Sequence, residues 1–328
     1  MQRIILHIGR HKSGTSAIQR FLGENRAAFA EAGIVIPTLG GFDNPEADEA
    51  DKVAHHLIAM DFGQSKKALP SQQKEWVSAV AQAAEGYDTL VLSSEAFQNA
   101  SDFTGLRALC NGRYVEVVCY LREYLDYALS AYAQEVKKSG ITSNFFEFER
   151  GFDPQLARFM TRWEHFANRC HWRLYDRAQL VGGDVVQDFL EVARLPDPGG
   201  PRPEQENPRL GGSLLGFKLM ANAAGLHSLK LAQTLEPMAR TRPEFRAPLP
   251  IGPERQSELR AAREYNRVLQ DHFGDLKLPS FAEGAWPLGS PRLSEDFGEI
   301  LSGLDAMPAI TNHPLFRQFI GASHDPPL

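Results

Sequence analysis

The sequence predicts an α/β protein, in which a parallel β-sheet flanked by helices is followed by a helical and irregular C-terminal region. Three observations support this prediction. Short apolar runs typical of buried strands recur along the first part of the chain, helical patterns stand between them, and this alternation stops near residue 196. Strands that alternate with helices form parallel sheets with helices on both faces.

The individual elements follow from the spacing of apolar residues. Apolar runs short enough for buried strands predict strands at 3–8, 34–36, 89–92, 115–121 and 171–175. Apolar residues at helical spacing predict helices at 15–32, 53–60, 71–85, 123–139, 156–166 and 185–193. Residues 38–51 are rich in glycine, proline and acidic residues, and they predict a loop.

The composition changes after residue 195. Residues 196–208 and 237–253 are rich in proline and predict a linker and a loop, with helices at 212–223 and 254–273. We therefore expect an α/β core over residues 1–195. The C-terminal region, residues 196–328, is expected to pack on the same domain.

Composition excludes several classes of protein. The chain has 328 residues, 43% of them hydrophobic, and a net charge of −6, which does not suit a protein that binds nucleic acid. Its three cysteines form no CxxC pair, so we expect free thiols and no metal site. No apolar run reaches the roughly 20 residues of a membrane span, and no signal peptide is evident. These features predict a cytoplasmic protein without an integral membrane segment.

The sharpest motif lies between the first predicted strand and the first predicted helix. It reads Gly9-Arg10-His11-Lys12-Ser13-Gly14-Thr15-Ser16. A helix N-terminus carries unpaired N–H groups and a partial positive charge, and it therefore binds phosphate or sulfate. The glycines let the backbone approach the anion, Lys12 adds a cation, and Thr15 and Ser16 add hydroxyl donors. The alternative is a plain glycine turn with an incidental lysine.

This loop differs from the Walker A pattern of nucleotide triphosphatases. That pattern places a lysine directly after its second glycine, followed by a hydroxyl that holds magnesium. Here Lys12 precedes Gly14. The position of the lysine therefore argues against an ordinary NTPase.

A second anion site is predicted after the strand at 115–121. Arg122 follows this strand, and Ser130 lies two turns into the next helix. Arginine can clamp a phosphate with two parallel hydrogen bonds, and a nearby hydroxyl can add a third. The alternative is a surface arginine beside an ordinary solvated helix face. Taken with the loop, the two residues predict two separate binding places for anionic groups.

These motifs resemble the bacterial PAPS-dependent sulfotransferases, where PAPS is adenosine 3′-phosphate 5′-phosphosulfate. The resemblance covers residues 1–195 and rests on three stretches, at 6–19, 93–97 and 120–140. It implies a P-loop-type sheet, PAPS as co-substrate and no required metal. It also implies transfer of a sulfuryl group to an acceptor hydroxyl on a carbohydrate, glycolipid or small metabolite.

The resemblance assigns a role to each motif residue. Lys12 is expected to stabilise charge on the leaving 5′-phosphate, and the 3′-phosphate group selects PAPS over ATP. The nucleotide-binding residues it implies are Arg10, His11, Lys12, Ser13, Gly14, Thr15, Ser16, Arg122 and Ser130.

An acceptor hydroxyl also needs a general base, a task that suits histidine or glutamate. His55 is the first candidate, followed by Glu95 and then His56. The two histidines precede an apolar helical stretch. Glu95 comes just after a predicted strand, where ligands gather in open parallel sheets. For each residue the alternative is an ordinary capping or surface role.

Two other functions compete with sulfuryl transfer. A P-loop kinase or NTPase would need a lysine after Gly14 and an acid for magnesium after a strand. A catalytically inactive relative would bind a nucleotide without turning it over. The chain also departs from the eukaryotic cytosolic sulfotransferases, because it lacks their C-terminal RKG…GDW segment and has Ala17 where they carry an adenine-packing tryptophan.

Overall fold

The computed structural model describes residues 2–10, 13–41, 49–63, 70–200, 210–279, 281, 287–289 and 292–319. The chain divides into two compact units. The first comprises Met1–Arg122 and Gln155–Glu206, and the second comprises Glu123–Pro154 and Asn207–Leu328. This division differs from the expected one, because the segment 123–154 groups with the C-terminal region. Its helix α7 (Tyr124–Lys138) packs against helices of that region.

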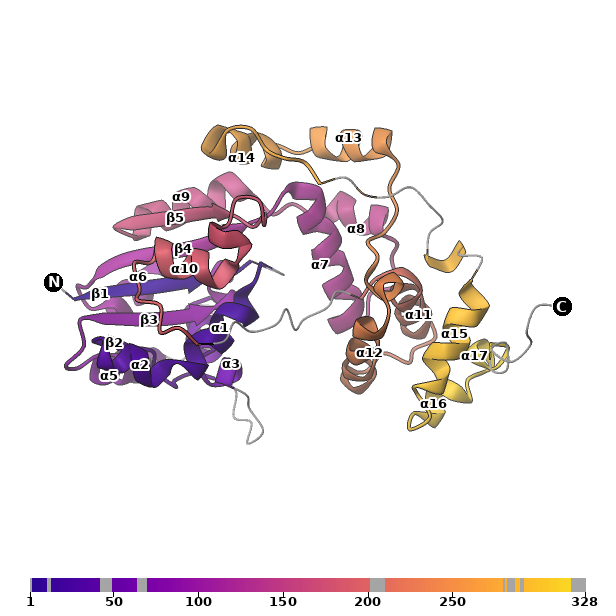
Figure 1. Ribbon diagram of the computed structural model, residues 1–328, viewed down its shortest axis with the longest axis horizontal. Helices are drawn as coiled ribbons and strands as arrows, with labels where there is room; N and C mark the ends of the chain where they lie inside the picture. Colours follow the sequence, from indigo (N-terminus) through magenta and orange to yellow (C-terminus); the bar gives the residue numbers. More distant parts are fainter. Residues whose placement is uncertain are drawn as a thin grey trace. The chain divides into compact units, whose positions relative to one another are not determined.

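A five-stranded parallel sheet forms the centre of the first unit (Figure 1). The strands are β1 (Arg3–Ile8), β2 (Ile34–Val35), β3 (Thr89–Ser94), β4 (Tyr114–Leu121) and β5 (Arg169–Leu174). Their order is β2-β3-β1-β4-β5, and every pairing is parallel. The predicted α/β fold with a parallel sheet is therefore confirmed.

Helices connect these strands and cover the sheet. They are α1 (Thr15–Glu24), α2 (Arg26–Glu31), α3 (Glu49–Lys52), α4 (His56–Gly63), α5 (Pro70–Ala83), α6 (Phe103–Cys110), α9 (Leu156–Phe166) and α10 (Val185–Val192), with 3-10 turns η1 (Glu95–Asn99) and η2 (Val181–Gly183). One buried cluster joins residues of α1, α2 and α10 to side chains of β1, β3 and β4, so these helices cover one face of the sheet.

The strand order creates a point where ligands bind in open parallel sheets. The connection after β1 leads toward β2 at one edge, whereas the connection after β4 leads toward β5 at the other. The neighbouring strands β1 and β4 therefore end where the topology switches direction. Parallel α/β sheets bind ligands outside the carboxyl ends of the strands at such a point.

The helix predicted at 15–32 is broken in the structure. Helix α1 ends at Glu24 and α2 begins at Arg26. Between them, the side-chain amide of Asn25 donates a hydrogen bond of 2.8 Å to the carbonyl of Phe21. Asparagine side chains compete with backbone groups for such carbonyls, which favours a helix end.

The second unit is helical among its described residues. Its elements are α7 (Tyr124–Lys138), α8 (Phe145–Gly151), α11 (Gly212–Ala223), α12 (Leu229–Thr241), η3 (Pro243–Arg246), α13 (Pro253–Ala261), α14 (Tyr265–Phe273), η4 (Pro287–Gly289), α15 (Leu293–Ser302), α16 (Pro308–Thr311) and α17 (Pro314–Arg317). The single helix predicted at 254–273 is thus two helices. Helix α12 extends past Pro237, where the sequence predicted a loop.

Helix α7 is fixed at both ends. At its start, the Glu123 carboxylate accepts the N–H groups of Leu125 and Asp126, at 3.0 and 3.1 Å. At its end, the amide of Asn222 donates to the carbonyls of Val136 and Ile141, each at 2.9 Å. Such contacts satisfy groups that a helix leaves unpaired at its termini.

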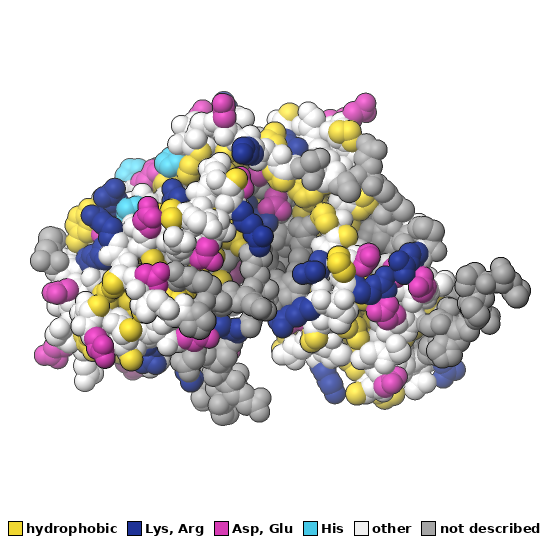
Figure 2. Space-filling model, viewed as in Figure 1, with side chains coloured by type: hydrophobic (Ala, Val, Ile, Leu, Met, Phe, Trp, Pro, Cys, Tyr) yellow, Lys and Arg dark blue, Asp and Glu magenta, His cyan; other side chains and the backbone are white. Residues whose placement is uncertain are grey.

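No described helix is long and apolar enough to cross a membrane. On the face of each unit that Figure 2 shows, basic and acidic side chains are interspersed, as the near balance of 35 basic and 41 acidic residues predicts.

Candidate functional site

The loop after β1 begins beside the end of β3. The N–H of Gly9 donates to the carbonyl of Ser94 at 3.3 Å. Ser13 closes the loop, because its hydroxyl donates to the Arg10 carbonyl at 2.6 Å and accepts the Arg10 N–H at 3.2 Å. The Ser13 hydroxyl therefore shapes the loop. The predicted ligand residues His11 and Lys12 lie outside the described residues.

Gly14 marks the start of α1 and adopts a left-handed conformation, with φ of +83°. Gly14 itself has no side chain that could cap this helix N-terminus. The hydroxyl of Thr15 is buried and has no hydrogen-bond partner among the described residues. The Ser16 side chain is exposed at the same end. A helix start that follows a glycine and carries a buried hydroxyl in its first turn has the donors that an anion requires.

Gly14 also leaves no room for a side chain. A Cβ built on it would lie 2.9 Å from Cε2 of Tyr175 and 3.0 Å from the methyls of Val185. We expect Gly14→Ala to destabilise the protein by more than the roughly 1–2 kcal/mol of a left-handed alanine. Gly86→Ala is the matched control, because Gly86 has φ of +82° and nothing within 4 Å of its Cβ position. Equal losses in the free energy of unfolding, measured in urea, would contradict this prediction.

Tyr175 connects Arg122 to the start of α1. The Arg122 guanidinium carbon lies 5.4 Å from the centre of the Tyr175 ring, and the edge of that ring contacts Gly14. The Tyr120 ring meets Tyr175 edge-on, at 6.4 Å and 84°. One aromatic ring therefore separates the predicted arginine from the predicted anion loop. The sequence analysis did not select Tyr175, although its position directly after β5 was a usable signal.

Arg10 is 4% exposed, and its guanidinium carbon lies 4.4 Å from the centre of the Phe159 ring in α9. This distance is typical of a cation–π contact. The structure thus places the Arg10 side chain against α9, within the first unit.

His55 is fully buried, and both of its ring nitrogens contact backbone groups. Its Nε2 lies 2.9 Å from the carbonyl of Pro37, and its Nδ1 lies 3.0 Å from the N–H of Ser93. This pattern assigns the ring proton to Nε2. Burial lowers the pKa of His55 to about 4, and its hydrogen bonds to Ser93 and Pro37 oppose that shift only in part. These contacts suit a structural histidine better than a general base.

His56 and Glu95 are half-buried and lie near the carboxyl end of β3. The Nδ1 of His56 lies 2.9 Å from the hydroxyl of Ser94, which also accepts the N–H of Ala96. The backbone of Glu95 borders the loop after β1, because its Cα is 3.2 Å from the position that a Cβ on Gly9 would take. Of the two histidines, His56 has the geometry that better suits proton transfer.

His7 is buried and contacts Ser93, the residue that also contacts His55. Its Nδ1 lies 2.8 Å from the Ser93 hydroxyl, and its ring packs 5.4 Å from that of Phe189. Burial lowers the pKa of His7 to about 3, although the charge of Glu95 opposes the shift. His7 is therefore a neutral core residue at physiological pH.

Ser130 lies in α7 of the second unit and is 1% exposed. Its hydroxyl has no hydrogen-bond partner among the described residues. Arg122 belongs to the first unit, so the shared phosphate site predicted for Arg122 and Ser130 stays a prediction.

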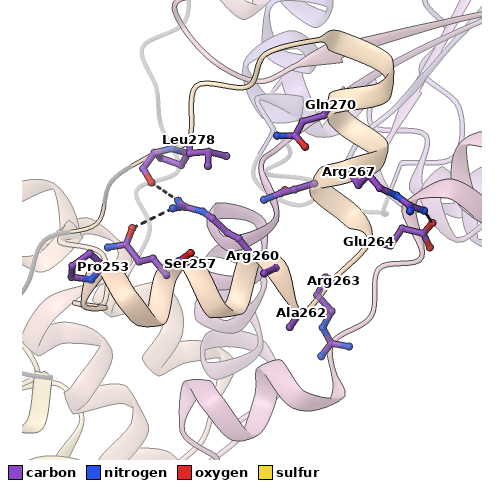
Figure 3. A pocket seen from close by; sticks show the side chains of 13 residues that line it. Pro253, Ser257, Arg260, Ala262, Arg263, Glu264, Arg267, Gln270 and Leu278 are labelled. Carbon is purple, nitrogen blue, oxygen red and sulfur yellow. Dashed lines mark hydrogen bonds and ion pairs between the residues drawn. The ribbon is translucent and has the colours of Figure 1, made fainter.

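The second unit has a pocket of about 830 Å³ between α13 and α14 (Figure 3). The arginines that line it have carboxylate partners. Arg260 pairs with Glu123 at 3.0 Å, and Arg263 pairs with Glu149 at 3.4 Å. Arg267 pairs with Glu264. Because each guanidinium is balanced by an acid, the pocket offers no excess of positive charge to an anion.

The described residues contain no cluster of three or more histidine, cysteine or acidic side chains that could hold a metal ion. No protein-family model matches the sequence, and no curated protein does. Among solved structures, a sulfotransferase from Alicyclobacillus acidocaldarius is similar to the chain at 17% identity and a TM-score of 0.36. The match covers 71% of this chain and 99% of that one. A likeness at this level does not bear on the activity of the chain.

Proposed function

We propose that this protein transfers a sulfuryl group from PAPS to an acceptor hydroxyl on a carbohydrate, glycolipid or small metabolite. The supporting observation is the contact series from Gly14 through Tyr175 to Arg122. It joins the N-terminus of α1 to a guanidinium at the switch point of a parallel sheet. A nucleotide with phosphates on its 5′ and 3′ positions needs two such cationic places.

In this proposal, the first turn of α1 and the hydroxyls of Thr15 and Ser16 bind the 5′-phosphosulfate. Lys12, from the same loop, neutralises charge on the leaving phosphate. Arg122 and Ser130 bind the 3′-phosphate, which ATP lacks. No metal is required, because protein cations supply the charge that the transfer needs.

The reaction is an in-line displacement at sulfur. The acceptor oxygen forms a bond to sulfur while the bond from sulfur to the bridging oxygen breaks, and that electron pair leaves on the phosphate. The proton of the acceptor hydroxyl passes to a general base. We assign this role to His56, with Glu95 as the second candidate, because both lie near the end of β3 and Glu95 borders the loop.

Thermal unfolding in the presence of nucleotides tests the proposed function. Adenosine 3′,5′-bisphosphate at a hundred times its Kd should add about 2.7 kcal/mol to the free energy of unfolding. ATP with magnesium should add much less. Stabilisation by ATP and magnesium alone would instead favour a kinase or NTPase. Binding of the bisphosphate without sulfate transfer to any acceptor would favour a catalytically inactive relative.

His55 and His56 should respond differently to substitution. His56→Gln is expected to lower kcat by about 10²–10⁴, the usual contribution of a general base, and to leave the Kd for adenosine 3′,5′-bisphosphate unchanged. His55→Gln should lower the melting temperature instead, because it disturbs buried hydrogen bonds to Pro37 and Ser93. Normal turnover in His56→Gln would move the assignment to Glu95.

A further inference from the structure

Helix α7 carries two buried polar atoms that have no hydrogen-bond partner among the described residues. They are the hydroxyl oxygen of Ser130 and the side-chain carbonyl oxygen of Gln134. Residues four apart lie on the same face of a helix, one turn from each other. The two atoms therefore form one polar patch, about 6 Å along the helix.

Other buried polar groups of α7 find partners inside the protein. The hydroxyl of Tyr132 donates to the carbonyl of Ser143 at 2.9 Å, and that of Tyr124 donates to the Glu149 carboxylate at 2.6 Å. Buried polar groups are paired in most native proteins, because leaving one unpaired costs free energy. Two exceptions on a single turn mark a place where a ligand supplies the missing partners.

The chemistry of the two atoms defines that ligand. A serine hydroxyl can donate to a phosphate oxygen, whereas an amide carbonyl can only accept. An ionised phosphate also only accepts, so it cannot pair with the buried Oε1 of Gln134. The partner of this oxygen must carry an O–H or N–H group beside the group that Ser130 binds.

We propose that Gln134 binds the ribose 2′-hydroxyl of the nucleotide whose 3′-phosphate contacts Ser130. The inference rests on the proposed function, in which Ser130 holds that phosphate. The 2′-hydroxyl is bonded to the carbon next to the phosphorylated one, and its proton can be donated to the Gln134 oxygen. Gln134 is thus a specificity-determining residue that distinguishes a ribonucleotide from its 2′-deoxy analogue.

Calorimetric binding of two nucleotides tests this inference. Adenosine 3′,5′-bisphosphate should bind the unmodified protein about tenfold more tightly than 2′-deoxyadenosine 3′,5′-bisphosphate, since a lost hydrogen bond leaves a buried acceptor unpaired. In Gln134→Ala this ratio should fall close to one. Ser130→Ala should weaken the binding of both nucleotides by a similar factor, so the ratio of their affinities should stay the same.

Lys138→Ala is the matched control, because Lys138 is an exposed residue in the last turn of the same helix. It should change neither affinity. Gln134→Met, which keeps the length of the side chain, provides a second variant if the alanine protein unfolds. Tight binding of both nucleotides with equal affinity would overturn this inference and leave the proposed function standing. An unchanged ratio of the two affinities in both Gln134 variants would do the same. Binding of neither nucleotide by the unmodified protein would overturn the proposed function as well.

Discussion

The protein is expected to lose stability steeply as the pH falls below 6.5. His7 and His55 are fully buried, and their pKa values are lowered to about 3 and about 4. The unfolded chain takes up protons on both residues near pH 6.5, whereas the folded protein does not. Their contribution to stability is therefore complete above pH 6.5 and is lost as the pH falls toward 4. At pH 5 the expected loss is roughly 4 kcal/mol in the free energy of unfolding.

Urea unfolding between pH 7.5 and pH 4.5 measures this slope. His55→Asn should make the slope about half as steep, although it also lowers stability at neutral pH by disturbing buried hydrogen bonds. His165→Asn is the control, since His165 is an exposed histidine. A free energy of unfolding that stays constant from pH 7 to pH 5 would show that the two imidazoles are not buried as described.

Lys12→Met is expected to lower turnover by about 10²–10³ at saturating donor. In the proposed reaction Lys12 neutralises charge that develops on the leaving phosphate, and loss of one such group typically has this effect on kcat. The ground-state nucleotide keeps its contacts to the start of α1 and to Arg122. The Kd for adenosine 3′,5′-bisphosphate should accordingly change by only a few-fold.

Single-turnover measurements with PAPS separate these two effects. Lys74→Met, which alters an exposed lysine of α5, should match the unmodified protein in both rate and affinity. Lys12→Arg keeps the positive charge on a bulkier group. Its single-turnover rate should therefore lie between the rates of Lys12→Met and the unmodified protein. If Lys12→Met transfers sulfate at the normal rate, the leaving phosphate must be stabilised by another cation.

The sheet could be predicted from sequence because its central strands β1, β3 and β4 are buried on both faces. The segment 3–8 is an apolar run, and β1 lies at the centre of the sheet with five of its six residues buried. Helix α7 was predicted equally well, since apolar residues such as Leu125, Leu129 and Val136 recur at helical spacing and are buried in the structure. The breaks at Asn25 and at residues 262–264 were missed, because local side-chain hydrogen bonds and turns leave the apolar spacing almost unchanged.

The candidate site was predictable only where one segment carries the signal. The glycine loop is local, and Gly14 starts a helix as expected. Tyr175 and Ser94 gain their importance from packing between segments that are far apart in sequence, which no local pattern records. The two adjacent histidines show the same limit. Only the folded chain reveals that His55 faces two backbone groups whereas His56 contacts the Ser94 hydroxyl.

The path of the chain through its two units has a consequence for synthesis and truncation. The chain leaves the first unit after Arg122 and returns at Gln155, so β5 emerges from the ribosome after α7 and α8. Until then β4 is an open sheet edge, which is a template for pairing with another chain. A fragment cut at a single point would therefore either lack this strand or carry part of the other unit. Isolating the first unit requires a designed linker from residue 122 to residue 155.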